Sequence, residues 1–405
     1  MPRRRLLIAV GILTFIAYCM TEKLGLGQVD NRPSIPGPRA LVGDAAPGLE
    51  RLDRVMLDTL RDSGIPGASL AIAKDGKLLL ARGYGLGNIA AHEPVQPQSL
   101  FNLASCSKPF TAVAVLKLVD EGKLRLDDRV FSLLSQLLPE GQPVDPRIYR
   151  ITVRELLHHS SGFARDEGVK RAPSLEAAVR AAAYRPLSYS PGTEIKYSNF
   201  GFLLLRVVVK QAASEDYERY IKQEVLQPLG IHDMRLDVEH GYVPGEVRRY
   251  SATRQVVPGG HGDVHGEGCW LASTVDVVPS LCSLDGSRGR HILSPRSLQE
   301  MVSAPAPPVK PHADGSHNGL GWDVVRPMPD GVLYQKNGGV AGISTFMEHL
   351  PNGVDWAVAF NGSGKVEESD PSGHEHPASP YKPIKDAIQA RTHWPTAVDL
   401  FGKYP

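Results

Sequence analysis

The feature that most constrains this chain is a serine and a lysine three residues apart at the start of an apolar run, in the segment Ser105-Cys106-Ser107-Lys108. Residues i and i+3 share one face of a helix, so the Lys108 amine can reach the Ser105 hydroxyl and accept its proton. Apolar residues at helical spacing follow as far as Gly122, a residue type that commonly ends helices. Ser105 is therefore expected at a helix N-terminus, where backbone N–H groups lack helical partners and an oxyanion is favoured.

Two later segments turn this common pair into a more specific pattern. A Ser-x-x-Lys pair alone also fits an N-cap serine followed by a surface lysine. Here it is followed by Tyr197-Ser198-Asn199 and then by Lys336-Asn337-Gly338-Gly339. In this order the segments resemble the Ser-x-x-Lys, Tyr-x-Asn and Lys-Thr-Gly motifs of the penicillin-recognising serine hydrolases. The resemblance is to the β-lactamase-related branch that contains class C β-lactamases, D-Ala-D-Ala carboxypeptidases and β-lactamase-like esterases.

The resemblance extends beyond the three motifs and covers roughly residues 48 to 362. The further segments that carry it are Leu156-Leu157-His158-His159-Ser160-Ser161-Gly162, Gly268-Cys269-Trp270-Leu271-Ala272-Ser273-Thr274, Gly319-Leu320-Gly321-Trp322 and Gly338-Gly339-Val340-Ala341-Gly342. It implies an α+β protein of the β-lactamase/transpeptidase-like fold, in which an antiparallel sheet is flanked by helices and joined by a helical domain.

The pattern of strands and helices agrees with this fold class. A helix is predicted over residues 49–60, and an Asp75-Gly76 turn between two apolar runs predicts a hairpin. Strands are expected near residues 333–336, 343–349 and 354–360, with a helix beginning at 273–276 and a last helix over 383–391. We therefore expect a discontinuous sheet domain from residues 48–115 and 266–405, a helical domain from residues 116–265, and a loop from 362 to 380.

The N-terminus predicts export. Arg3, Arg4 and Arg5 precede an apolar run from Leu6 to Met20, which at about fifteen residues is shorter than the roughly twenty needed to span a bilayer. Residues 1–27 are expected to be a signal peptide or an uncleaved signal anchor, and residues 28–47, rich in proline and glycine, a linker. The predicted location is periplasmic or extracellular, with membrane attachment through the N-terminal segment left open.

Composition argues against one class of function. The formal net charge is +1, and the 45 lysine and arginine residues are scattered rather than gathered into a stripe, so nothing indicates a nucleic-acid-binding protein. The expected partner is a small-molecule or peptide-like substrate. Oligomeric state cannot be inferred from the sequence.

The motifs assign chemistry to individual residues. Ser105 is the predicted nucleophile, with Lys108 as its base when Lys336 lies nearby. Tyr197 is expected to pass a proton to the leaving group, and Asn199 to bind the substrate amide and Lys108. The resemblance also implies that Lys336 faces a substrate carboxylate.

Three further residues are expected to bind substrate. Gly338 and Gly339 allow the substrate close to the backbone, and the N–H of Gly339 is the expected second oxyanion donor. Asn337 departs from the family pattern, because threonine or serine is usual there and its hydroxyl commonly helps to hold a substrate carboxylate. This departure weakens the expectation of β-lactam-type substrates more than that of acyl-enzyme chemistry.

Other signals compete with this interpretation. His261, Asp263 and His265 have the spacing of metal ligands, but a further ligand set is missing, so neither a metal nor a cofactor is expected. His158 and His159 could suggest a Ser-His-Asp triad, but no Gly-x-Ser-x-Gly segment accompanies them, and a structural role at a buried helix end is favoured. A disulfide between Cys269 and Cys282 is left open.

The sequence as a whole predicts a serine hydrolase that cleaves an ester or amide through an acyl-enzyme on Ser105, as an esterase, a D-aminoacyl peptidase or a β-lactamase-like enzyme. The alternative is a relative that keeps the pocket for binding or scaffolding and has lost turnover. The ionisable members of all three motifs are present, which favours the enzyme.

Overall fold

The computed structural model describes residues 40–138, 145–163, 174–237, 241–259, 270–289, 291–362 and 379–404. Several sequence-based expectations lie outside these residues. They are the signal segment at 1–27, the linker before residue 40, the histidine cluster at His261, Asp263 and His265, the thiol of Cys269, and the loop predicted after Gly362, as far as residue 378.

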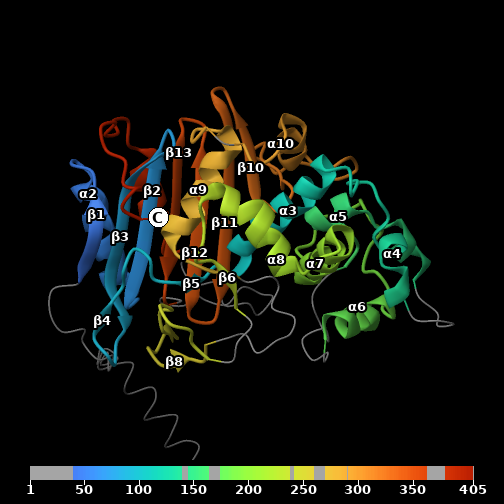
Figure 1. Ribbon diagram of the computed structural model, residues 1–405, viewed down its shortest axis with the longest axis horizontal. Coiled ribbons are helices and arrows are strands. Elements are labelled where there is room, and N and C mark those ends of the chain that lie inside the picture. Colours follow the sequence, from blue (N-terminus) through green and yellow to red (C-terminus); the bar gives the residue numbers. More distant parts are fainter. Residues whose placement is uncertain are drawn as a thin grey trace, which may run out of the picture. The chain divides into compact units, whose positions relative to one another are not determined.

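An antiparallel sheet forms the centre of the described chain (Figure 1). Its strands, in spatial order, are β1 (Leu41–Ala45), β3 (Lys77–Asn88), β2 (Gly67–Lys74), β13 (Val354–Phe360), β12 (Ile343–Leu350), β11 (Gly331–Val340) and β10 (Val324–Met328), with β4 (Glu93–Pro94) pairing to β3. The early hairpin β2–β3 thus lies beside the last strand of the chain. This arrangement brings residues near 70 and near 357 side by side.

Side chains alternate between the two faces of the sheet along each strand, and each face packs against a different set of helices. On β2, Leu70 and Ile72 join a core with α2 (Glu50–Ser63) and α11 (Lys382–Gln389). Ala71 and Ala73 point to the opposite face, where α9 (Thr274–Asp285) packs on β2 and β13. Successive strand residues point to opposite faces, and small alanines let a helix approach closely. The sheet is therefore covered by helices on both faces.

The remaining helices gather beyond the β10–β11 side of the sheet (Figure 1). The α-helices are α3 (Lys108–Asp120), α4 (Val130–Leu133), α5 (Val153–Leu157), α6 (Leu175–Ala183), α7 (Asn199–Ala213), α8 (Tyr217–Ile221) and α10 (Pro295–Met301). Shorter turns are η1 (Ala104–Ser107), η2 (Ser135–Leu137), η3 (Pro146–Arg150), the π-type turn η4 (Lys222–Leu226) and η5 (Gln227–Leu229). The α+β fold class is confirmed, as are the predicted hairpin, the three late strands and the last helix.

Two expectations about the organisation need correction. The linker predicted for residues 28–47 is wrong over Leu41–Ala45, which form the edge strand β1. The segment predicted as a helical domain, residues 116–265, also holds short strands. These are β6 (Arg235–Leu236), which pairs with β9 (Trp270–Ala272) and through it joins β5 (Phe101–Asn102), and the pair β7 (Arg249–Tyr250) and β8 (Val256–Val257). Helix α3 runs across the expected domain boundary at residue 116. One hydrophobic core contains residues of α3, of the helical segment and of the sheet, so the two expected domains share a core.

Candidate active site

The segment that carries Ser105 is a tight turn rather than the first turn of an α-helix. Residues Ala104–Ser107 form the 3₁₀ turn η1, and the α-helix α3 begins at Lys108. Nearly all of α3 is buried, which explains why its sequence is apolar on every side. Ser105 therefore lies at the N-terminal end of a buried helix, as expected, but one turn ahead of its regular part.

Ala104 holds the serine turn in an unusual backbone conformation. Its φ of +47° lies in the left-handed region, which costs a residue with a Cβ about 1–2 kcal/mol. Its N–H donates to Asn102 Oδ1 at 2.7 Å, and Asn102 in turn donates to Asp237. The buried guanidinium of Arg249 donates to the same carboxylate at 2.7 Å. A buried polar network thus fixes the turn immediately before Ser105.

Ser105 Oγ lies between an amine and a phenol. Lys108 Nζ donates to it at 3.2 Å and to Asn199 Oδ1 at 2.9 Å. Tyr197 Oη donates to it at 2.5 Å. The structure therefore brings together residues from two distant parts of the sequence, because α7 begins at Asn199 beside α3.

The amines of two lysines lie near the ring of Tyr197. Lys108 Nζ lies 5.0 Å and Lys336 Nζ 5.2 Å from the ring centroid, and both lysine side chains are buried, with exposures of 1% and 0%. Tyr197 itself is 43% exposed. Both lysine nitrogens therefore lie within the roughly 6 Å at which an amine interacts with the face of an aromatic ring.

The ring of His159 packs against the ring of Tyr197. The two rings stack with centroids 4.4 Å apart, and the N–H of Ser198 donates to His159 Nδ1 at 3.2 Å. Burial, followed by the charges of Lys336 and Lys108, lowers the pKa of His159 well below its usual value, so the imidazole is neutral. His158 is also buried, and its ring nitrogen meets the carbonyl of Ser303 at 3.1 Å. Both histidines lie at the buried end of α5, as predicted.

The third motif lies on β11, directly beside the serine turn. Gly338 permits this contact, because a Cβ there would approach Leu103 O to 2.5 Å and Thr345 Oγ1 to 2.4 Å. We expected Gly338 to admit substrate, but it admits the turn that carries Ser105. A Cβ on Gly339 would meet nothing closer than 3.9 Å, so the open side of the strand is at Gly339.

Sequence reasoning missed Asp323, which pairs with Lys336 at this strand. Asp323 Oδ1 accepts from Lys336 Nζ, and Asp323 Oδ2 accepts from the N–H of Asn337 at 3.3 Å. The sequence held a signal for this contact. Asp323 directly follows the segment Gly319-Leu320-Gly321-Trp322, and a Pro329-Asp330 turn joins β10 to β11 in a hairpin that places Asp323 beside Lys336. Lys336 therefore already has a carboxylate partner within the protein.

Two thiols lie near these elements. Cys106 is buried beside Ser105, and its Sγ is 3.5 Å from Lys336 O. Burial raises the pKa of Cys106 to about 12, so its thiol is protonated and unsuited to nucleophilic attack. Cys282 is a buried free thiol on α9. Among the residues described, His, Cys, Asp and Glu form no group of three able to hold a metal ion.

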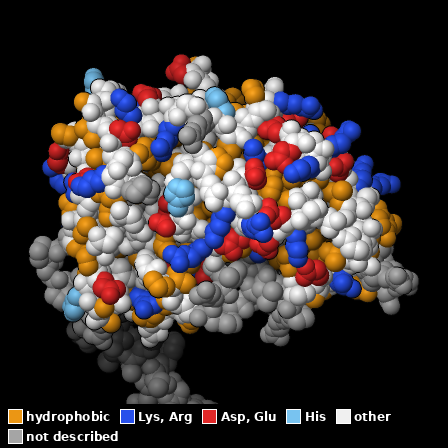
Figure 2. Space-filling view, viewed as in Figure 1, with side chains coloured by type: hydrophobic (Ala, Val, Ile, Leu, Met, Phe, Trp, Pro, Cys, Tyr) orange, Lys and Arg blue, Asp and Glu red, His pale blue; other side chains and the backbone are white. Residues whose placement is uncertain are grey.

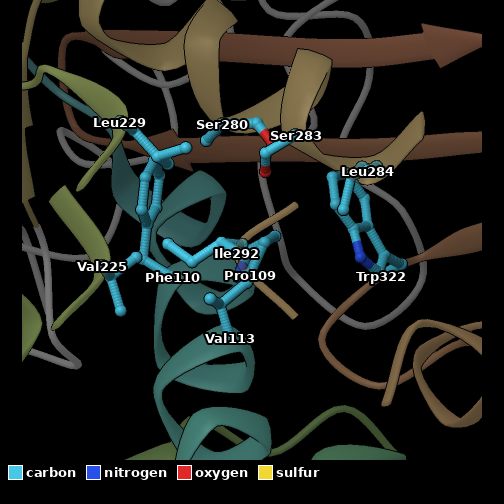
Figure 3. Close-up of a pocket in the computed structure, with 10 residues that line it drawn as sticks. All are labelled: Pro109, Phe110, Val113, Val225, Leu229, Ser280, Ser283, Leu284, Ile292 and Trp322. Carbon is cyan, nitrogen blue, oxygen red and sulfur yellow. The ribbon is translucent and has the colours of Figure 1, made fainter. Parts of the chain in front are cut away.

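A small apolar cavity lies behind the serine helix. Its free volume is about 10 Å³, and it lies between α3 and α9, where Phe110 and Val113 face Ser280 and Ser283 (Figure 3). Neither Ser105 nor Lys108 lines it. The cavity has room for at most about one water molecule, which is too small for a substrate.

Charges of both signs are interspersed over the face of the molecule shown in Figure 2. Within the portion of the chain that the structure describes, none of the helices combines the length and apolar character needed to cross a membrane.

Comparisons with known proteins agree with this fold. A model of the beta-lactamase family matches residues 52–375. The chain is similar to Protein flp of Staphylococcus aureus, with 31% identity over 186 residues, which cover 44% of this chain and 36% of that protein. It is also similar to Esterase EstB of Burkholderia gladioli, with 33% identity over 232 residues, which cover 53% of this chain and 56% of that protein. The chain thus matches only part of the length of these curated relatives.

A solved structure shows the same fold. The octameric penicillin-binding protein homologue from Pyrococcus abyssi superposes with a TM-score of 0.68 at 23% identity, covering 84% of this chain and 76% of that one. The fold is that of the β-lactamases and transpeptidases, and the predicted fold family is confirmed. The chain belongs to the beta-lactamase family, whose members are serine hydrolases acting on ester or amide bonds.

Proposed function

We propose that this protein is an exported serine hydrolase that cleaves ester or amide bonds through an acyl-enzyme on Ser105. The observation that carries the proposal is the position of Ser105 Oγ, which lies 3.2 Å from Lys108 Nζ and 2.5 Å from Tyr197 Oη. A hydroxyl becomes a useful nucleophile when a neighbouring group can take its proton as it attacks. Lys108 is placed to take this proton, and Tyr197 is placed to pass a proton on to the leaving group.

The proposed reaction has two halves. Ser105 Oγ adds to the substrate carbonyl while its proton passes to Lys108 Nζ, which acts as the base. The oxyanion is stabilised by the N–H groups of Ser105 and Gly339. The tetrahedral intermediate then expels an alcohol or amine, which receives a proton by way of Tyr197. A water molecule attacks the resulting acyl-serine with the same groups in reverse roles, releasing a carboxylic acid and regenerating the hydroxyl.

Small esters are the substrates that we favour. The similarity to a protein named an esterase supports this choice. Asn337 also supplies an amide where the related enzymes usually have a hydroxyl that helps to bind a carboxylate. A hydrogen bond to a charged group contributes about 1.5–3 kcal/mol, so its loss would weaken β-lactams and D-aminoacyl peptides by about ten- to a hundredfold.

Covalent labelling tests the nucleophile. The protein is treated with a fluorophosphonate, and its intact mass is measured. Ser105→Ala should abolish the mass increase while the free energy of unfolding changes by less than about 1 kcal/mol. Ser107→Ala is the matched control, because Ser107 lies in the same turn but is fully buried and its Oγ accepts from the Trp270 N–H. That variant should still be labelled, and full labelling of the Ser105 variant would refute the assignment.

A further inference from the structure

The carboxylate of Asp323 contacts both the ammonium group and the backbone of the third motif. One oxygen accepts from Lys336 Nζ and the other accepts from the Asn337 N–H at 3.3 Å. The side chain of Lys336 has an exposure of 0%, whereas that of Asp323 is 25% exposed. The charged group that solvent reaches at this point is therefore the carboxylate, not the ammonium.

The backbone holds Asp323 firmly in this place. Its N–H donates to Gln335 O at 3.1 Å, and its carbonyl accepts from Asn318 Nδ2 at 3.0 Å. Strands β10 and β11 pair Val324 with Gln335, so the same register places Asp323 opposite Lys336. The contact between Asp323 and Lys336 is thus a property of the sheet register rather than of a mobile surface side chain.

In the proposed reaction, this part of the site lies on the side of the leaving group. In the proposed reaction Tyr197 delivers the proton to the leaving group, and Lys336 Nζ lies 5.2 Å from the ring centroid of Tyr197. A carboxylate on the leaving group would approach Asn337 and meet the like charge of Asp323, while the charge of Lys336 is already neutralised. Like charges brought together in a partly buried site oppose binding.

We propose that Asp323 is an internal counter-anion that makes this protein select substrates whose leaving group is uncharged or cationic and reject those whose leaving group carries a carboxylate. The proposal rests on the proposed hydrolase function of Ser105. It names a specificity-determining residue and a substrate class, namely esters of neutral or cationic alcohols.

The experiment uses the full chain and three butyrate esters that differ at one leaving-group substituent. The esters are those of 3-hydroxybenzoate, 3-hydroxybenzamide and 3-(trimethylammonio)phenol, and their alkaline hydrolysis rates correct for intrinsic reactivity. We expect kcat/KM to rise from the carboxylate to the carboxamide by at least about tenfold, as a like charge requires, and not to fall for the cation. Equal values for carboxylate and carboxamide in the unmodified protein would overturn the proposal.

Asp323→Asn provides the second measurement. The amide keeps the shape and one acceptor oxygen but removes the charge, so the carboxamide-to-carboxylate ratio should fall at least about fivefold whatever happens to the absolute rates. An unchanged ratio in a folded variant would also overturn the proposal. If this variant does not fold, the three-ester series on the unmodified protein still decides. Failure of the hydrolase function gives a different result, because no ester would then be cleaved faster by the unmodified protein than by Ser105→Ala.

Discussion

His158 shows how one buried side chain couples stability to pH. Burial lowers its pKa from 6.5 to about 4, because a charged imidazole loses its hydration there. Below pH 6.5 the unfolded chain binds a proton at this residue while the folded chain does not. Folding stability must therefore fall as the pH falls from about 6.5 towards 4, and at pH 5 the loss from this residue is about 2 kcal/mol.

The variant His158→Gln tests this coupling. Glutamine does not titrate, and its side-chain amide can still donate to Ser303 O. We expect the unmodified protein to lose about 2 kcal/mol more than the variant between pH 7 and pH 5, measured by urea unfolding at each pH. His159 keeps a lowered pKa in both proteins, so both still lose stability in acid. Equal losses in the two proteins would show that His158 is charged in the folded state.

Residues of the site differ in how far sequence could place them. Ser105 and Lys108 are close in sequence, so helical geometry alone predicts their contact. Tyr197 and Lys336 were assigned through resemblance, because no local rule joins positions so far apart. The contact of Asp323 with Lys336 depends on the register of a hairpin, and a register shifted by one residue would point Asp323 to the other face of the sheet.

At the scale of elements, the site depends on the approach of the η1 turn to β11. Gly338 makes this approach possible and Gly339 does not take part in it. In Gly338→Ala the new methyl group collides with Leu103 O and Thr345 Oγ1, so the turn or the strand must shift. Such overpacking costs about 1–3 kcal/mol and would displace Ser105 from its partners.

Gly339→Ala is the matched control for this prediction. Its methyl group would make only an ordinary contact, 3.9 Å from Ile343 O, and its N–H, the proposed oxyanion donor, is retained. We expect the Gly338 variant to lose at least about a hundredfold in ester kcat/KM and the Gly339 variant to stay within about tenfold of the unmodified protein. The thermal midpoint should drop only in the former. The opposite ranking would mean that the turn does not rest on Gly338.

Elements were predictable where their patterns are local. The helix 50–63, the Asp75-Gly76 hairpin and the three late strands follow from periodicity and turn residues. Strand β1 was missed because Leu41–Ala45 is a short edge strand that contains glycine and follows a proline-rich stretch. Its strand conformation comes from pairing with β3, which is a tertiary contact. The two-residue strands β6 to β8 were also missed. They are too short to show the alternation of apolar and polar residues that marks a strand, and they too are defined by pairing with other segments.

At the scale of the whole molecule, the sheet joins the two ends of the described chain. Strand β1 is an edge of the sheet, and near the other end Tyr404 donates to Asp44 within that strand. The folded body therefore begins by Leu41, earlier than the sequence suggested.

Export is the prediction that belongs to this scale. The basic Arg3-Arg4-Arg5 start and the apolar run to Met20 precede the first strand, so residues 1–39 should suffice to direct a protein out of the cytoplasm. We would fuse them to a reporter that is active only outside the cytoplasm. The matched control replaces Ile12 and Phe15 by aspartate, which interrupts the apolar run without changing its length. We expect reporter activity with the natural segment and none with the control. An inactive reporter behind the natural segment would contradict the prediction of export.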